Sequence, residues 1–279
     1  MRLSSLSGLF RLEDLMNLIY AIILGAVQGV AEFLPISSSG HLVIVGELLT
    51  ALFGRSLPDW LQGMTMNVAL HFGTLLSIAT VYFRDLLGLL QRWRLLLLIV
   101  LSSIPAGVVG ILYKDALEAL FQNALAAGIC LLGTATILLA ARRLRGAERS
   151  LSELSAGRAL VIGVFQAVAI LPGISRAGST VGAGLMCGLR PADAAKYSFF
   201  LAVPAIGGAS LLELVELFGE QDSTRPELLP ILLGMLVSYL VGVISLRALI
   251  RLLAADRLHW FAWYCGTVGL LTICWQLCV

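Results

Sequence analysis

Long apolar stretches constrain this chain more than any other feature. Six of them run for about 20 residues or more, the length that an α-helix needs to cross the hydrocarbon core of a bilayer. Hydrophobic residues make up 59% of the 279 residues and charged residues 13%, whereas a soluble domain carries about a quarter charged residues. We therefore predict an all-α polytopic membrane protein. Its six predicted spans lie near residues 63–84, 93–113, 119–142, 191–218, 227–251 and 258–277.

Two further apolar regions, residues 15–53 and 156–189, are interrupted by Pro, Gly and Ser. Non-helical backbone is tolerated at membrane depth only where it is buried in protein or lines a water-filled cavity. We therefore predict that each region forms a re-entrant pair of short helices joined by a loop inside the membrane.

The two interrupted regions resemble each other at a constant offset of 138 residues. Each is followed by three predicted spans, and three is an odd number, so the second copy must enter the membrane from the opposite side. This pattern is typical of an inverted-topology repeat, which builds its site where broken helices meet. We predict one integral membrane domain over residues 1–279, with halves at about 13–145 and 153–279. The matched pairs are Gly25 and Gly163, Gln28 and Gln166, Ala31 and Ala169, Ser37 and Ser175, and Gly40 and Gly178.

Positive charges support this topology. Thirteen of the 19 Lys and Arg residues fall on one predicted side and five on the other, so the positive-inside rule makes the first side cytoplasmic. The first broken pair then enters from the outer face. Residues 1–12 are predicted to be a poorly ordered extension or an interfacial anchor. The thirteen are Arg84, Arg92, Arg94, Arg142, Arg143, Arg145, Arg149, Arg158, Arg190, Lys196, Arg247, Arg251 and Arg257.

Composition argues against several other functions. A net charge of +2, with no basic cluster interleaved with aromatic residues, does not favour nucleic-acid binding. The five cysteines form no C-x-x-C pair and lie in apolar runs, where buried small hydrophobes are the expected interpretation.

The first broken region carries the most reactive residues. In QGVAEFLPISSSGH, Gln28 to His41, Gln28 and Glu32 are four residues apart and fall on one helix face. Pro35 ends that helix, because proline has no N–H to donate and clashes with the preceding turn. Such polar groups are costly in hydrocarbon unless they have a function. The hydroxyls and the imidazole that follow are Ser37, Ser38, Ser39 and His41.

The second broken region, LPGISRAGST, has the character of an anion site. Pro172 and Gly173 interrupt the helix, and the start of the next helix offers unpaired N–H groups that favour anions. Arg176 is the only arginine inside an apolar segment, and its guanidinium suits phosphate oxygens. Its structural alternative is an ion pair with Glu32 that holds the two halves together. The candidate anion ligands are Gly173, Ser175, Arg176, Gly178, Ser179 and Thr180.

Together the two regions can supply a nucleophile, a general base and a cation for phosphoryl transfer. Because a diphosphate is strongly anionic, we expect Mg²⁺ or Ca²⁺ to take part, with Glu32 and phosphate oxygens as ligands. His71 lies four residues after Asn67 in the predicted span 63–84; it either lines the cavity or bonds to a neighbouring helix.

These two motifs resemble those of the undecaprenyl-diphosphate phosphatases, the bacitracin-resistance proteins of bacterial inner membranes. The likeness continues in NVALHFGTLL and KYSFFLAVPAIGGASLLEL and covers roughly residues 17–275. It implies release of phosphate from undecaprenyl diphosphate for cell-wall synthesis, a site open to the periplasm, a divalent cation and a homodimer. It also implies that Glu32, Ser38, His41 and Arg176 are the catalytic residues. We expect Gln28, Ser37 and Ser39 to contact the substrate. Gln28 stands where many members have a second glutamate, and Ala177 replaces a frequent serine.

Two mechanisms are compatible with these residues. In the first, Ser38 attacks the terminal phosphorus while His41 withdraws its proton. In the second, Glu32 or His41 directs a water molecule onto the phosphorus, and Ser38 only hydrogen-bonds to the substrate. A secondary transporter or a lipid flippase would explain the inverted repeat and the anion site equally well, but it has no need of a serine and a histidine beside a carboxylate.

Overall fold

The computed structural model describes residues 12–53, 63–121, 123–146, 148–219 and 227–278. The extension predicted at residues 1–12 lies almost wholly outside the described residues. Helices account for nearly all of the described chain, and its only β-pairing is an isolated bridge between Arg149 and Leu189. The helices are α1 (Leu12–Ala31), α2 (Ser38–Phe53), α4 (Met64–Val81), α5 (Phe83–Leu89), α6 (Trp93–Leu112), α7 (Lys114–Phe121), α8 (Ala124–Arg143), α9 (Ala156–Val168), α10 (Arg176–Met186), α11 (Pro191–Gly219), α12 (Leu228–Ala254) and α13 (His259–Cys278).

Six helices of the described chain are long and apolar enough to cross a membrane, namely α1, α6, α8, α11, α12 and α13. The prediction of a multi-pass all-α membrane protein is confirmed. These six helices differ from the six predicted spans in one member. Helix α1 is among them, whereas the predicted span 63–84 is not. That span is α4, which bends by 83° into α5 and counts as a seventh crossing only if the bent pair is taken together.

Both interrupted regions fold as helix–turn–helix, as predicted. The helix of the first region ends at Ala31, four residues before Pro35, and that of the second ends at Val168, four residues before Pro172. The first region is longer than a short re-entrant pair requires, because the 20 residues of α1 extend for about 30 Å and the 13 of α9 for only about 20 Å. Since the two breaks contact each other, the additional length of α1 lies at its N-terminal end.

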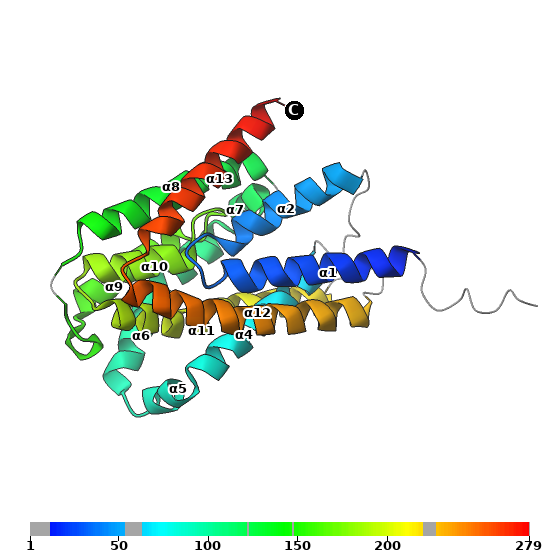
Figure 1. Cartoon of the computed structure of the whole chain (residues 1–279). Coiled ribbons are helices and arrows are strands. Elements are labelled where there is room, and N and C mark those ends of the chain that lie inside the picture. The colour runs from blue at the N-terminus through cyan, green and yellow to red at the C-terminus, as the bar shows by residue number, and fades with distance from the viewer. Residues whose placement is uncertain (1–11, 54–62, 122, 147, 220–226, 279) are drawn as a thin grey trace, which may run out of the picture.

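The two halves exchange partners. The first broken pair packs through α1 against α12 of the second half, and the second packs through α9 against α6 of the first half. The equivalent helices α8 and α13 pack on each other, as do α4 and α11. In Figure 1 α1 lies beside α12, and α13 lies beside α8. This reciprocal packing is what an inverted repeat predicts, because each half covers the apolar faces of the other.

Two glycines allow the close contact between α1 and α12. A Cβ atom at Gly25 or Gly29 of α1 would meet backbone oxygens of α12, those of Gly234 and Ser238. Small residues let membrane helices approach in this way, and the approach fixes the first break against the core.

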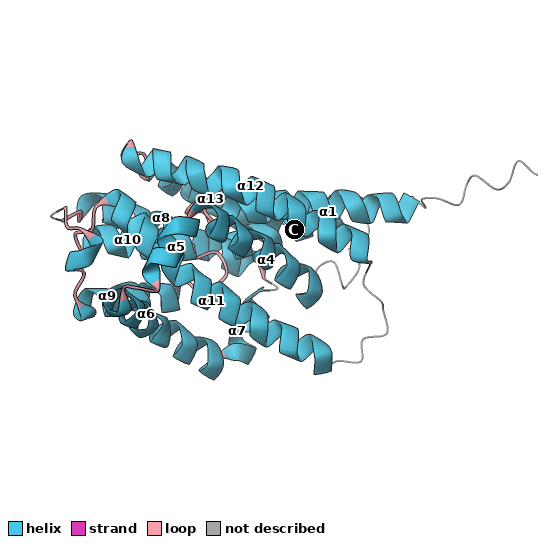
Figure 2. Cartoon of the chain, turned by 90° about the horizontal axis from the view of Figure 1, so that it is seen from below, coloured by secondary structure: helices cyan, strands magenta, loops and turns pink. Residues whose placement is uncertain are grey.

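The predicted basic side is one end of the helix bundle. Its loops are joined by charged and polar contacts, all made by residues of the predicted cytoplasmic group. Figure 2 shows the bundle from below, with the loops between α8 and α9 and between α12 and α13 at the same end. The contacts are Arg94 to the Ser152 carbonyl, Arg145 to Asp256, Arg190 to the Glu148 carbonyl and Lys196 to Asp85.

Candidate active site

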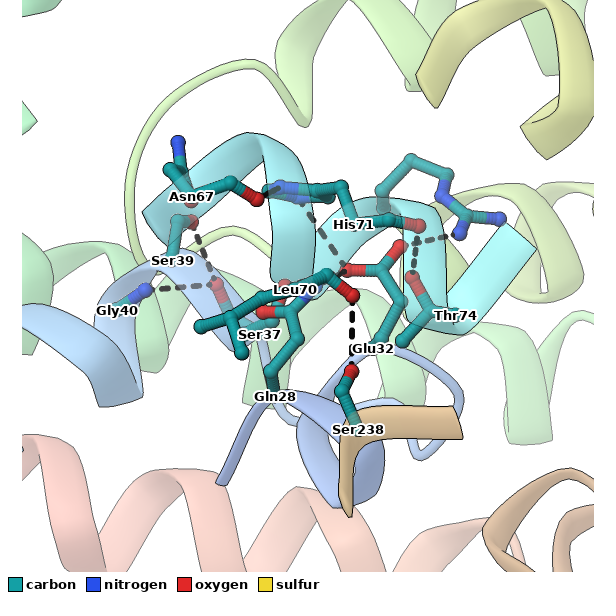
Figure 3. A network of polar contacts seen from close by, with 12 residues as sticks. Gln28, Glu32, Ser37, Ser39, Gly40, Asn67, Leu70, His71, Thr74 and Ser238 are labelled. Atoms are coloured by element: carbon teal, nitrogen blue, oxygen red, sulfur yellow. Dashed lines mark hydrogen bonds and ion pairs between the residues drawn. The ribbon is translucent and has the colours of Figure 1, made fainter. Parts of the chain in front are cut away.

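Glu32 is the centre of a polar network between the two broken regions (Figure 3). It lies in the turn after α1, and its side chain is only 6% exposed. Oε1 accepts a hydrogen bond from Nη2 of Arg176 at 2.6 Å, and Oε2 accepts one from Oγ of Ser38 at 2.6 Å. Nε2 of Gln28 donates to Oε2 at 3.2 Å, which confirms that Gln28 and Glu32 share one helix face. One carboxylate therefore joins the motifs predicted to meet.

Arg176 begins α10 and reaches Glu32 from the second half of the chain. The ion pair that sequence analysis gave as the structural alternative is present. It uses only part of the guanidinium, which has five N–H donors. Besides Glu32, the described contacts engage Nη1 with the carbonyl of Ser198 at 3.4 Å. The side chain keeps 15% of its surface exposed, so Arg176 can hold Glu32 and still offer donors to an anion.

A hydrogen bond from a backbone N–H to a side-chain hydroxyl, and a close approach of two glycines, hold the two breaks together. Ser37 has a positive φ of 71°, and its Oγ accepts from the N–H of Gly173 at 3.2 Å. Gly173 itself has φ of 99°, a conformation that side chains rarely adopt. A Cβ at Gly40 would meet the Cα of Gly173, so glycine is needed on both sides of this contact.

The start of α10 is partly capped by side chains of the described chain, so some of the N–H groups expected to be open there are already bonded. Oγ of Ser175 accepts from the N–H of Gly178 at 3.0 Å, and Thr134 of α8 binds both the N–H of Ser175 and the carbonyl of Gly173. The hydroxyl of Thr180 bonds to Ser198 at 2.6 Å. These groups hold the break in shape, and a direct contact of Gly173, Ser175, Gly178 or Thr180 with substrate stays a prediction.

Two polar atoms in the same region have no hydrogen-bond partner within the described ranges. They are Oε1 of Gln28 and Oγ of Ser179, on side chains that are 0% and 1% exposed. Buried polar atoms are normally satisfied by protein, water or ligand. Both residues were predicted to lie beside the substrate, and their orphan atoms fit that role. Ser39 bonds to the hydroxyl of Ser37 at 3.3 Å and stays close to the first break.

His41 does not contact Ser38 in the way that the first mechanism requires. Its Nδ1 lies 2.8 Å from the carbonyl of Ser37, and its Nε2 lies 2.9 Å from the hydroxyl of Tyr264 on α13. The rings of His41 and Tyr264 are stacked, with centroids 5.6 Å apart. Both ring nitrogens are therefore engaged away from the Ser38 hydroxyl, which donates to Glu32 instead. The predicted Ser38–His41 pair is wrong for this structure.

A different imidazole lies at the carboxylate. His71 projects from α4, with Nε2 4.0 Å from Oε2 of Glu32 and Nδ1 2.9 Å from the carbonyl of Asn67 (Figure 3). His71 therefore lies beside the Glu32 network, and the prediction that it lines a cavity stays a prediction. Tyr264 was not predicted as part of the site. The spacing of Asn67 and His71 was visible in the sequence, whereas nothing near Tyr264 pointed to His41.

These residues do not form a complete cage for a divalent ion. A hard cation such as Mg²⁺ needs about six oxygen ligands. No group of three or more His, Cys, Asp and Glu residues suited to a metal occurs in the described part of the chain. Both oxygens of Glu32 are already engaged, one of them by Arg176. The chain therefore does not fit a resident ion held by Glu32, and any cation at this site must take most of its ligands from phosphate and water.

The sequence of the chain matches a known family. A family described as "Bacitracin resistance protein BacA" matches residues 21–271. The chain belongs to the BacA family. It is 41% identical to an undecaprenyl-diphosphatase of Rhodopirellula baltica over 92% of this chain and 97% of the relative. Undecaprenyl-diphosphatases of Methanosphaera stadtmanae and Halothermothrix orenii are 36% and 38% identical, over 93% and 92% of this chain and 98% of each relative. The resemblance inferred from the two motifs is thus confirmed.

Proposed function

We propose that this membrane protein hydrolyses undecaprenyl diphosphate to undecaprenyl phosphate and inorganic phosphate, which recycles the carrier lipid of cell-wall synthesis. One observation carries the proposal. In a chain whose relatives bear the name undecaprenyl-diphosphatase, Glu32 binds a serine hydroxyl with one oxygen and the guanidinium of Arg176 with the other. A hydroxyl nucleophile oriented by a carboxylate, beside a cation for the transferring phosphate, suits phosphoryl transfer.

In the mechanism that this geometry favours, Ser38 attacks the terminal phosphorus. The bond from that phosphorus to the bridging oxygen breaks, undecaprenyl phosphate leaves, and a phosphoserine forms. Water then cleaves the phosphoserine and releases phosphate. Glu32 orients the hydroxyl at 2.6 Å, and the remaining donors of Arg176 stabilise the charge on the transferring group. In the rival mechanism water attacks directly and Ser38 only binds the substrate.

Three further features belong to this proposal. A divalent cation, Mg²⁺ or Ca²⁺, neutralises part of the negative charge of the diphosphate. It binds together with the diphosphate, because the chain itself offers few ligands for it. The protein lies in the bacterial inner membrane with its basic end in the cytoplasm, following the positive-inside rule, and its site opens toward the periplasm. It forms a homodimer, as the family resemblance implies.

Phosphate release by the purified protein in detergent micelles tests the function. We expect release from undecaprenyl diphosphate, loss of release in EDTA and its return with excess Mg²⁺ or Ca²⁺. Arg176→Ala should release almost none, whereas Arg142→Ala, which removes an exposed arginine at the basic end, should behave as the unmodified chain. Micelles have no second compartment into which a substrate could be transported. If the protein were a transporter or flippase without hydrolytic activity, neither the unmodified chain nor either variant would release phosphate from undecaprenyl diphosphate.

The nucleophile is tested separately at Ser38. Serine attack predicts that Ser38→Ala loses nearly all turnover and that rapid acid quenching of the unmodified chain yields a phosphoserine at this position. Near-normal turnover of both Ser38→Ala and Ser38→Cys would exclude serine attack and favour direct attack by water. The hydrolase assignment would stand in either case.

A further inference from the structure

The imidazole of His71 and the hydroxyl of Ser38 both lie near the same carboxylate oxygen of Glu32. We propose that His71 is a catalytic residue of this site and that its Nε2 receives the proton of the reacting Ser38 hydroxyl. The proposal rests on the proposed function. It assigns to α4 of the first half a role that sequence analysis gave to His41 of α2.

The tautomer of His71 supports this role. A backbone carbonyl only accepts hydrogen bonds, so the contact of Nδ1 with the Asn67 carbonyl at 2.9 Å places a proton on Nδ1. In the neutral ring Nε2 then carries a lone pair and is the acceptor. That nitrogen lies 4.0 Å from Oε2 of Glu32, the same oxygen to which Ser38 donates at 2.6 Å. Proton-transfer contacts are often long before substrate binds and shorten in the reacting complex.

Glu32 is less suited to keep this proton. Its other oxygen is paired with Arg176 at 2.6 Å in a buried position. A protonated Glu32 would leave the guanidinium without its counter-charge, which is strongly unfavourable in a buried site. The carboxylate therefore orients the hydroxyl and stays charged, and the proton continues to a neighbouring base.

The other two histidines are less suitable acceptors. His41 has its Nε2 bonded to Tyr264, and His259 begins α13 beside the basic loops at the end of the bundle. His71 is also the most exposed member of the trio at Glu32, with 24% of its side chain accessible, against 15% for Arg176 and 6% for Glu32. Its imidazole therefore keeps more accessible surface than the two side chains of the ion pair.

The proton balance is complete over one cycle. In the first step the Ser38 O–H bond breaks and the Oγ–phosphorus bond forms, while the bond from that phosphorus to the bridging oxygen breaks and undecaprenyl phosphate leaves. The Ser38 proton then rests on Nε2 of His71. In the second step water adds a hydroxyl to phosphorus, the Oγ–phosphorus bond breaks, and Ser38 recovers its proton from His71. The second proton of the water leaves with the released phosphate.

Steady-state turnover of three variants in the full-length protein tests the proposal. His71→Phe keeps a ring of similar shape without nitrogen, so we expect kcat to fall by roughly 10²- to 10⁴-fold, with KM changing far less. His71→Ala should be equally slow, and added imidazole should restore part of its kcat. His259→Phe is the matched control for loss of a histidine, with unchanged turnover expected.

Several outcomes would overturn the inference. Normal kcat in His71→Phe would do so, as would a loss of kcat that appears only in His41→Phe. If His71→Phe unfolds at lower temperature than His259→Phe, the imidazole rescue of His71→Ala decides, and its absence rejects the proton role. An inactive unmodified chain would instead refute the proposed function and leave no activity to lose, so the two failures are distinguishable.

Discussion

The two broken regions share a backbone design and differ in chemistry. In each, a serine hydroxyl accepts from the N–H three residues later, Ser37 from Gly40 at 3.4 Å and Ser175 from Gly178 at 3.0 Å. Both pairs are related by the offset of 138 residues found in the sequence. Residue 38 begins α2 and residue 176 begins α10, so these helices also start 138 residues apart.

At these equivalent first positions the residues differ, and both bind the same carboxylate. Ser38 donates to Oε2 of Glu32 and Arg176 donates to Oε1. The carboxylate has no counterpart, because Ile170 stands at the position equivalent to Glu32. A repeat can therefore keep one backbone geometry twice and place a nucleophile on one copy and a cation on the other.

Among the variants that test this comparison of the two regions, those of the Glu32–Arg176 pair should lose the most turnover and stability. Glu32→Gln or Arg176→Gln should each abolish measurable turnover and lower the free energy of unfolding by about 3–5 kcal/mol, because each leaves one buried charge without its partner. The double variant should also be inactive but should unfold at higher temperature than either single variant. Thermal unfolding in detergent measures this coupling. If the double variant loses as much stability as the two single variants together, the two side chains do not stabilise each other.

Sequence reasoning anticipated the backbone better than the side-chain partners. The apolar lengths and the Pro35 and Pro172 breaks predicted the helices, because hydrophobic length and proline act locally. The meeting of the two motifs followed from the repeat. The hydrogen-bond partner of the His41 side chain could not be predicted from the sequence. Tyr264 lies 223 residues from His41 in the chain, and only tertiary packing brings the two together.

The length of α1 shows the same limit. The matching motifs predicted two equal broken regions, but motifs do not determine how far a helix extends beyond them. The bend between α4 and α5 was also missed, because the apolar run near residues 63–84 has no proline at its end. Both errors concern where a helix ends relative to the membrane, which local composition predicts poorly.

The contact between the breaks depends on Gly173, where the next largest effect is expected. Gly173→Ala would force a side chain into φ of 99° and place its Cβ against the carbonyl of Ala127. We expect a loss of about 1–3 kcal/mol in unfolding free energy and a clear loss of turnover. Gly46→Ala is the control, because a Cβ at Gly46 of α2 meets nothing within 4 Å. Equal stability of the two variants would contradict a strained contact at Gly173.

The two serine caps should differ by a smaller amount. Ser175→Ala removes one acceptor at the start of α10 and should cost about 1 kcal/mol of unfolding free energy. Ser37→Ala removes an acceptor that serves both Gly40 and Gly173, so its cost should be larger and its turnover lower. Chemical denaturation of both variants beside Ser103→Ala, whose hydroxyl donates to the carbonyl of Ile99 in its own helix among the described residues, measures the difference. A larger cost at Ser175 than at Ser37 would argue against a link between halves through Ser37.

The smallest effect is expected at the two equivalent glutamines, and here the halves should respond in opposite ways. Gln28 donates to Glu32, whereas neither amide atom of Gln166 has a hydrogen-bond partner in the described part of the chain, although the side chain is 2% exposed. A buried unsatisfied amide is unfavourable, so Gln166→Leu should keep turnover and raise the free energy of unfolding by about 1 kcal/mol. Gln28→Leu should lower turnover, because it removes a donor from the carboxylate that orients Ser38. Lower turnover in Gln166→Leu, with stability unchanged, would instead place the second glutamine in the site and make the two regions more alike than their side chains indicate.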